Sequence, residues 1–364
     1  MIKYLGSKRI LVPRIVEVVR ALGPDVRTVI DLFSGTSRVG HALKREGYRV
    51  LANDHNAYAA TLARCYVQAD DGLAAPATEI IAELNALPGK PGYFTRTFCR
   101  RSRFIQPRNG ARIDAIRDRI ARMNLKPDLE AVLLTALMQA ADRVDSTTGV
   151  QMAYLKSWAP RAANPLELRL PELLPRSPHG KSLAHQLDAL DAAALLEADA
   201  AYIDPPYNQH SYLGNYHIWE TLVRWDNPTT YGVACKREDV RSRRSVFNSR
   251  RESARALADL LARVRAPNLI VSFNDEGFLS LDELQAMLAP RAHLTTLAFD
   301  SKRYVGAKIG IYNPQGRKVG TVGRLRNVEY LIVATRRPPP AALLALAREH
   351  PLPDNTDRRL AVAG

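Results

Sequence analysis

The sequence predicts an α/β fold in which a doubly wound, mainly parallel sheet is interrupted by a mainly helical insertion. Over the first 70 residues, short apolar runs that end near an acidic residue alternate with helical patterns, as is typical of a parallel sheet. The same kind of strand returns near residue 200. Between them, residues 71–195 contain no convincing strand alternation, which indicates an insertion.

The first 70 residues are predicted to contain one helix followed by two strand–helix pairs. The predicted elements are a helix over 8–22, a strand over 26–33, a helix over 41–47, a strand over 48–54 and a helix over 56–69. Apolar residues recur at helical spacing in the first helix, where Pro13 is tolerated in or near the first turn. Gly47 ends the helix between the two strands.

Residues 71–195 are predicted to form a largely helical insertion, with helices over 112–123 and 128–143. After it we expect strands over 199–207, 268–275, 293–300 and 327–336, a helix over 281–288, and a long hairpin or flap over 306–323. The predicted organisation is a discontinuous α/β domain, residues 1–70 and 196–336, an insertion, residues 71–195, and a C-terminal tail, residues 337–364.

The composition is that of a globular protein long enough for roughly two domains. The chain has 364 residues, of which 46% are hydrophobic and 24% charged. No run of 18 apolar residues could span a membrane, and the N-terminus lacks the pattern of a secretory signal. Cys65, Cys99 and Cys235 are scattered and form no CxxC pair. A disulfide framework and a cysteine-rich zinc site are therefore excluded, and we expect a reducing, cytoplasmic setting.

The net charge of +15 is concentrated in three segments. Residues 96–126, 236–255 and 302–326 carry net charges of +8, +5 and +7, so the rest of the chain carries about −5. Solvated helix faces and loops are one explanation of such segments. A mildly acidic body with three basic segments favours the other explanation, a face that binds a polyanion such as nucleic acid.

The segment IDLFSGTSRVG, residues 30–40, predicts a nucleoside-binding turn. Ligands of open α/β sheets bind at the carboxyl ends of the strands, where a glycine turn lets the backbone approach them. The dinucleotide fingerprint is not matched, because Ser37 stands at its second glycine, and the lysine of a P-loop is missing after Gly40. Asp54 follows Asp31 by 23 residues, about where an acid reaches the hydroxyls of a ribose, although a strand-terminal acid can also simply cap a helix.

The strongest signal is Asp204-Pro205-Pro206-Tyr207, directly after an apolar strand. Two prolines remove backbone donors and fix φ, so the chain leaves the strand in a rigid, extended corner. This corner offers a carboxylate, a free carbonyl and an aromatic face, which suit a planar base with an exocyclic amine. A Pro-Pro turn that merely caps a strand is the alternative. The nucleoside-type turn and the basic segments favour the base-binding interpretation.

These segments resemble the DNA adenine methylases that use S-adenosylmethionine, especially the subgroup that accompanies restriction systems. The resemblance lies in KYLGSKR (3–9), IDLFSGTSRVG (30–40), LANDHN (51–56), DPPY (204–207) and the stretches 208–228 and 270–277. It covers most of 1–70 and 200–335, whereas the insertion matches weakly, as expected of a variable target-recognition region. It implies a Rossmann-like methyltransferase sheet and a site-specific methyltransferase that acts on adenine in double-stranded DNA.

The resemblance also implies a cofactor site, with S-adenosylmethionine as substrate and S-adenosylhomocysteine as product. Its residues would be Tyr4, Lys8, Asp31, Phe33, Gly35, Asp54 and Asp204. Tyr4 and Lys8 would line the methionine end of the cofactor, and Asp54 would bind the ribose hydroxyls. The family often has a second glycine where this chain has Ser37, so the sequence departs from the family pattern at this backbone position and keeps it at Asp54.

The same resemblance assigns the catalytic corner. Asp204 and the carbonyl of Pro205 would hold the amine of a flipped adenine, and Pro206 and Tyr207 would complete the site, with Tyr207 stacked on the base. The adenine amine is a poor nucleophile, because its lone pair is delocalised into the ring. Two acceptors favour a pyramidal nitrogen and stabilise its developing charge, and no metal or covalent intermediate is required.

Three other functions are alternatives to this one. Methylation of cytosine at carbon 5 would need a nucleophilic cysteine, usually after a proline, and no cysteine of this chain follows a proline. Methylation of RNA adenine remains an alternative, because the DPPY motif does not read the sugar. A catalytically silent DNA-binding protein that responds to S-adenosylmethionine is a further alternative, disfavoured because Asp204 and Tyr207 are both intact.

Partners follow from the charge and from the resemblance. Four arginines after the catalytic corner are expected to hold DNA phosphates, or else to form one solvated helix face: Arg241, Arg243, Arg244 and Arg251. His210 and His217 have no cysteine partners, so no metal site is expected. The expected partners are double-stranded DNA and a cognate restriction endonuclease that acts separately, without a membrane, in a bacterial-type cytoplasm near the nucleoid.

Overall fold

The structure is a computed structural model, and it describes residues 1–5, 8–291, 293–302, 311–312, 318–320 and 326–353. Most of the expected flap over 306–323, and most of the third basic segment, lie outside the described residues. Within that stretch β9 (Ile311–Tyr312) and β10 (Lys318–Gly320) form an antiparallel pair. No helix in the described part of the chain is long and apolar enough to cross a membrane.

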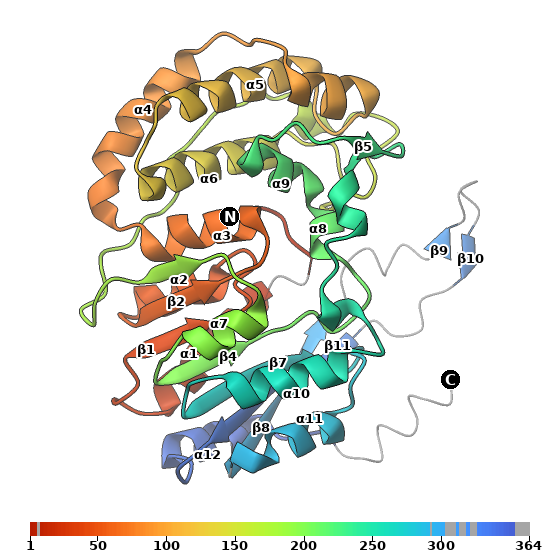
Figure 1. Cartoon of the computed structure of the whole chain (residues 1–364). Helices are drawn as coiled ribbons and strands as arrows, with labels where there is room; N and C mark the ends of the chain where they lie inside the picture. The colour runs from red at the N-terminus through yellow and green to blue at the C-terminus, as the bar shows by residue number, and fades with distance from the viewer. Residues whose placement is uncertain (6–7, 292, 303–310, 313–317, 321–325, 354–364) are drawn as a thin grey trace.

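A seven-stranded sheet lies at the centre of the molecule (Figure 1), which confirms the predicted α/β fold. Its order is β3-β2-β1-β4-β7-β11-β8. The strands are β1 (Thr28–Asp31), β2 (Arg49–Asn53), β3 (Leu183–His185), β4 (Ala200–Ile203), β7 (Asn268–Asn274), β8 (His293–Lys302) and β11 (Arg326–Thr335). Neighbouring strands are parallel from β3 to β7, whereas β11 is antiparallel to both β7 and β8. The sheet is therefore mainly parallel, and the direction of strand order along the chain reverses between β1 and β4.

Helices cover both faces of this sheet, which explains why its strands are apolar without interruption. The helices α1 (Val12–Ala21), α2 (Arg38–Arg45) and α12 (Ala341–Glu349) pack on one face. The helices α7 (Ala189–Leu195), α10 (Ser253–Arg263) and α11 (Leu281–Leu288) pack on the other. Successive residues of β1 alternate between the two cores, since Val29 is buried in the first and Ile30 in the second.

The helical insertion builds a third core, at the top of Figure 1. Its main helices are α4 (Ala74–Ala86), α5 (Pro107–Arg122) and α6 (Pro127–Arg143), with a short helical segment at Thr95–Arg101. Buried side chains of α3 (Ala57–Ala63) and α9 (His217–Arg224) belong to the same core. The insertion is thus packed directly on two helices that the α/β domain contributes.

The structure contains elements that the sequence analysis did not predict. Among them are α10 and also α12, which packs on the sheet within the expected tail. Residues 183–195, which the sequence assigned to the insertion, form β3 at the edge of the sheet and α7 on its face, so the sheet begins before the expected boundary at residue 196. A strand of three residues is too short for alternation to reveal it. The helix α4 was also not predicted, and Pro76 lies in its first turn.

Gly40 lets α2 lie close against the sheet. Its N–H donates a hydrogen bond of 3.0 Å to Oδ2 of Asp31, the last residue of β1. A Cβ atom at this position would lie 2.9 Å from Cγ2 of Val67 and 3.1 Å from Oδ2 of Asp31. The glycine is therefore required by close approach within a packed interior.

We expect the substitution Gly40→Ala to lower the free energy of unfolding by about 1–2 kcal/mol, because overpacking outweighs the better helix propensity of alanine. At an ordinary helical glycine the same change stabilises, so the sign of the effect is the test. Urea unfolding measures it, with Gly72→Ala as control, since a Cβ at Gly72 meets nothing within 4 Å. A Gly40→Ala variant more stable than the parent would contradict the close approach.

Candidate active site

A cleft lies at the carboxyl ends of β2, β1 and β4, where the strand order reverses. Ligands of open α/β sheets bind at such a switch point. The cleft encloses about 1210 Å³, including the space at its open mouth. Eight of the residues predicted to bind cofactor or base line it together: Tyr4, Lys8, Asp31, Phe33, Gly35, Asp54, Asp204 and Pro206.

The turn after β1 has the backbone that a glycine-rich turn would have. Gly35 has a φ of +50°, and a Cβ there would lie 3.5 Å from the ring of Tyr4. Ser37 also adopts the left-handed region, with a φ of +59°, although it is not a glycine. Its side chain is fully buried, and its hydroxyl has no hydrogen-bond partner within the described residues. The departure from glycine at this position therefore changes the side chain and leaves the conformation of the turn intact.

Asp54 follows β2 and is held by two backbone groups. Its Oδ2 accepts a hydrogen bond of 3.0 Å from the N–H of Gly35, and its Oδ1 accepts one of 2.9 Å from the N–H of Asn56. Burial raises the pKa of Asp54, and these two donors oppose the rise. The carboxylate is thus fixed at the wall of the cleft, between the first turn and the start of α3.

Asp31 is the most deeply buried acid of the site, with 1% of its surface exposed. Burial raises its pKa to about 7, the N–H of Gly40 lowers it, and the charges of Asp204 and Asp54 raise it further. The three acids therefore lie near enough to one another to interact, as the adjacency of their strands predicts.

Asp204 begins the DPPY corner and faces a buried cation. The Nζ atom of Lys8 lies 3.2 Å from Oδ1 of Asp204 and 3.0 Å from Oε2 of Glu329, on β11. Burial raises the pKa of Asp204 to about 6, Lys8 lowers it, and Glu329 raises it. Burial alone would lower the pKa of Lys8, but Asp204 and Glu329 raise it well above its ordinary value. One cation therefore joins the N-terminal segment to two strands.

The rest of the corner lies beside the cleft. The Tyr207 ring does not line the cleft; it packs on Phe273 with centroids 5.3 Å apart, and Nζ of Lys8 lies 5.6 Å from its centroid. Pro205 is buried, and no described residue donates a hydrogen bond to its carbonyl oxygen. The corner thus presents an acceptor without an internal partner, as its two prolines predict.

Several residues that shape the cleft were missed by the sequence analysis. The ring of Tyr4 is stacked between Tyr212 and Tyr216, with centroids 5.2 and 4.5 Å apart. Both tyrosines lie on the segment after the DPPY motif, in α8 (Tyr212–Asn215) and just before α9. Their spacing of four residues was the available signal. For Glu329, the signal was a lone carboxylate inside the apolar strand 327–336.

The four arginines predicted to bind DNA differ in their surroundings. Arg243 donates to Glu220 at 2.9 Å, and Arg241 lies 3.4 Å from Glu238 with its guanidinium 4.0 Å from the ring centre of Tyr231. Arg243 and Arg244 line the cleft, whereas Arg241 and Arg251 do not. Arg244 and Arg251 are exposed, and neither makes an ion pair within the part of the chain that the structure describes. These two are the arginines free to meet a phosphate.

The two histidines near the site differ in burial. His217 is buried, and its Nε2 lies 3.0 Å from the carbonyl oxygen of Gln151; burial lowers the pKa of His217 to about 3. His210 is exposed. Among the described residues no group of three or more His, Cys, Asp or Glu side chains could hold a metal ion.

Comparison with known proteins gives one family and several relatives. The family model described as "D12 class N6 adenine-specific DNA methyltransferase" matches residues 4–273. The chain is 28% identical over 303 residues to modification methylase StsI of Streptococcus sanguinis, and 30% identical over 305 residues to type II methyltransferase M.FokI of Planomicrobium okeanokoites. Each match covers 79% of this chain and 46% of the relative, so the chain spans about half the length of these two proteins. Type II methyltransferase M.NlaIII of Neisseria lactamica is 29% identical, with 78% of this chain and 86% of the relative covered.

The raised pKa of Asp31 predicts a specific dependence of stability on pH. The folded state holds this proton up to about pH 7, and the unfolded state loses it near pH 4, so this residue makes the parent less stable as the pH rises between those values. Asp31→Asn has no such carboxyl group, so the loss is absent. In urea unfolding, the free energy of unfolding of the variant minus that of the parent should rise from pH 4 to pH 7 and stay constant above pH 7. The exposed substitution Asp25→Asn should show no such trend. Parallel pH profiles of Asp31→Asn and the parent would refute the assignment.

Proposed function

Because the chain belongs to the D12 class of N6 adenine-specific DNA methyltransferases, we propose that it methylates the N6 amine of adenine at a specific sequence in double-stranded DNA. The methyl donor is S-adenosylmethionine, and the target adenine is flipped out of the duplex. The observation that supports this proposal most strongly is the position of Asp204. It stands in the same cleft as Asp31 and Asp54, directly after β4, which pairs with β1, and β1 in turn pairs with β2.

The residues of the cleft fit the nucleoside part of S-adenosylmethionine. Asp54 carries a carboxylate that two backbone donors orient, and the bare backbone of Gly35 leaves room beside it. The hydroxyl of Ser34 is buried in this lining and has no hydrogen-bond partner within the described residues. Asp54 would bind the ribose hydroxyls, Phe33 would contact the purine, and Tyr4 and Lys8 would line the methionine end. Bound S-adenosylmethionine supplies a methyl group on a positively charged sulfur, which is already a strong electrophile.

The task of the protein is to make the adenine amine a better nucleophile. Asp204 and the Pro205 carbonyl offer two acceptors for the two amine N–H groups, which favours a pyramidal nitrogen and stabilises the positive charge that develops on it. Asp204 is the stronger acceptor when ionised, and the neighbouring Lys8 favours that form against the effect of burial. Tyr207 would stack on the base after a movement of its ring, since it now packs on Phe273. Placing amine and methyl in line then completes the requirement.

The DNA is proposed to lie along the basic segments of the insertion and of residues 236–255. The insertion carries Arg96, Arg100 and Arg101 in or beside the short helix Thr95–Arg101, and Arg101 reaches Thr230 at 3.3 Å. Thr230 pairs with Arg237 in a two-stranded ladder, so the first basic segment lies close to the start of the second. On this proposal the chain modifies chromosomal DNA in a bacterial cytoplasm, as the partner of a restriction endonuclease that acts separately.

We expect Asp204→Ala to abolish methyl transfer while leaving DNA binding within a few-fold of the parent, because DNA affinity comes mainly from phosphate contacts. The direct test expresses parent and variant in a host that lacks adenine methylation and sequences both genomes by a method sensitive to modified bases. The parent should methylate adenine at one recurrent sequence, and the variant should methylate none.

An unmodified genome with the folded parent protein would refute the proposed function. Modified RNA together with unmodified DNA would move the activity to the RNA alternative. Equal loss of activity and DNA affinity in Asp204→Ala, measured on a folded variant, would refute the role of this carboxylate.

The exposed arginines give a separate prediction about DNA. Replacing Arg244 and Arg251 by alanine should lower the affinity of the protein for specific and for random duplexes by about the same factor. It should also reduce the steepness of the plot of log affinity against log salt by ~0.9 for each phosphate that the variant no longer neutralises. The control variant replaces Arg263 and Arg265 by alanine. These arginines precede β7, at the amino ends of the parallel strands and so opposite the cleft, and they pair with Asp259 and Glu197. A loss of discrimination between sites with an unchanged slope would instead indicate base reading, and no change in either would remove both arginines from the DNA surface.

A further inference from the structure

The segment after the DPPY motif has one face that begins at the proposed cofactor cleft, which Tyr212 lines. Tyr212, Tyr216 and Glu220 follow one another at intervals of four residues. The two tyrosines stack on Tyr4, and Glu220 reaches the start of α3, directly after the Asp54 loop. This face therefore contacts both segments that carry predicted cofactor ligands from the N-terminal part of the chain.

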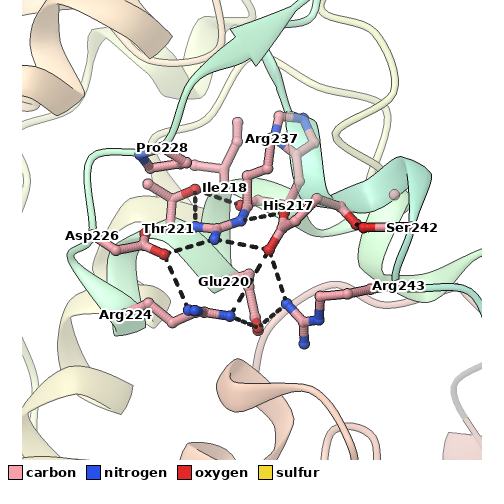
Figure 2. A network of polar contacts seen from close by, with 12 residues as sticks. His217, Ile218, Glu220, Thr221, Arg224, Asp226, Pro228, Arg237, Ser242 and Arg243 are labelled. Carbon is pink, nitrogen blue, oxygen red and sulfur yellow. Dashed lines mark hydrogen bonds and ion pairs between the residues drawn. The ribbon is translucent and has the colours of Figure 1, made fainter.

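Glu220 is a fully buried carboxylate with two hydrogen-bond donors and a more distant cation, Nη1 of Arg224, 3.9 Å from its Oε1. Its Oε2 accepts a hydrogen bond of 3.1 Å from the N–H of Tyr58, in the first turn of α3. Its Oε1 accepts one of 2.9 Å from Nη1 of Arg243 (Figure 2). A buried carboxylate that loses its cation destabilises the folded state strongly. The ion pair with Glu220 therefore holds the Arg243 side chain in this position.

Arg243 belongs to a larger network of ion pairs (Figure 2), which joins Arg224, Arg237 and Arg243 to Glu220, Asp226 and Asp239. Arg237, 2% exposed, binds Asp226 through two contacts of 2.7 Å and Asp239 at 3.0 and 3.1 Å. Arg224 lies 3.1 Å from Asp226, and Arg243 lies 3.3 Å from Asp239. The charges balance, and the network fixes the base of residues 241–252, which we call the basic arm, to α9.

The basic arm has a second attachment at the cleft itself. Phe247 is buried and packs edge-on against Phe33, with ring centroids 5.3 Å apart. Asn248 donates to the carbonyl oxygen of Asn208 at 2.7 Å, just after the DPPY motif. From the first attachment to the second, residues 243–248 line the cleft. The arm is therefore a wall of the proposed cofactor site as well as a candidate DNA contact.

We infer that Glu220 is a positioning residue, which fixes the position of the basic arm relative to the start of α3. Through Arg243 it seats the arm against the cleft, and through Tyr58 it seats the helix that follows Asp54. Binding of the cofactor in the cleft then stabilises the position of the arm that contacts DNA, and DNA on the arm stabilises the cleft. Each ligand therefore raises the affinity of the protein for the other. This inference rests on the proposed function, and it assigns Arg243 to the anchor and Arg244 and Arg251 to the contact with DNA.

The test uses Glu220→Gln, which keeps an acceptor for the N–H of Tyr58 and removes the charge that holds Arg243. The control is Glu238→Gln, which removes the same charge from an exposed pair beside the arm. Two quantities are measured in the full-length protein: the affinity for S-adenosylmethionine by calorimetry, and the rate of tryptic cleavage within residues 241–252 with and without S-adenosylmethionine.

In the parent and in Glu238→Gln, S-adenosylmethionine should slow cleavage of the arm at least several-fold. In Glu220→Gln we expect about ten-fold weaker cofactor binding, faster cleavage without cofactor, and little protection when cofactor is added. The double variant Glu220→Gln with Arg243→Gln should bind cofactor no more weakly than Glu220→Gln alone, because the two residues act as one pair.

The inference is overturned if Glu220→Gln only lowers the melting temperature and leaves cofactor affinity and protection unchanged, since that is a purely structural role. It is also overturned if the parent binds cofactor without protecting its arm. A parent that binds no S-adenosylmethionine refutes the proposed function itself, and this inference with it. Should Glu220→Gln fail to fold, Arg243→Gln tests the same pair from its partly exposed end, with the same expected results.

Discussion

A single buried ammonium group, that of Lys8, bridges two carboxylates that come from separate parts of the sheet. Asp204 directly follows β4 and Glu329 lies within β11, and Nζ of Lys8 lies 3.2 Å from the first carboxylate and 3.0 Å from the second. A buried charge is costly unless an opposite charge compensates it. Because Lys8 lies just before α1, the same contact draws the N-terminal segment across the sheet and places Tyr4 beside Gly35. The proposed amine-binding carboxylate and the methionine end of the cleft are therefore built by one electrostatic constraint.

A second ion-pair system repeats this arrangement on the other side of the cleft. Glu220 is compensated by Arg243, as Asp204 is by Lys8, and each pair joins segments that are distant in the chain. The segment between the DPPY motif and β7 therefore does more than connect two strands. It places two tyrosines in stacking contact with Tyr4 and accepts a hydrogen bond from the start of α3. It also holds the arm whose Phe247 packs against Phe33. These contacts let one part of the chain serve the proposed cofactor site, the proposed base site and the proposed DNA surface.

The sequence predicted the features that local chemistry determines. Apolar runs with an acid at the end predicted β1, β2 and β4, and the resemblance to the adenine methylases implied a site that contains Asp31, Asp54 and Asp204. In the structure all three line one cleft. The sequence did not predict Glu329 or Glu220, because their roles depend on Lys8 and Arg243, which lie far from them along the chain. It also treated the four arginines after the corner as equivalent, whereas an ion pair occupies Arg243 and leaves Arg244 exposed. Ser37 shows the limit of motif matching, since its backbone takes the conformation expected of the glycine it replaces.

The central claim is that one cleft holds both the cofactor and the flipped adenine, with Asp204 between them. The most direct measurement is a crystal structure of the protein with S-adenosylhomocysteine and a duplex that contains the methylated sequence. The account predicts the ribose hydroxyls on Asp54, and the adenine amine within hydrogen-bond distance of the Asp204 carboxylate and the Pro205 carbonyl. A nucleoside bound away from the ends of β1, β2 and β4, or a flipped base whose amine meets neither acceptor, would contradict it.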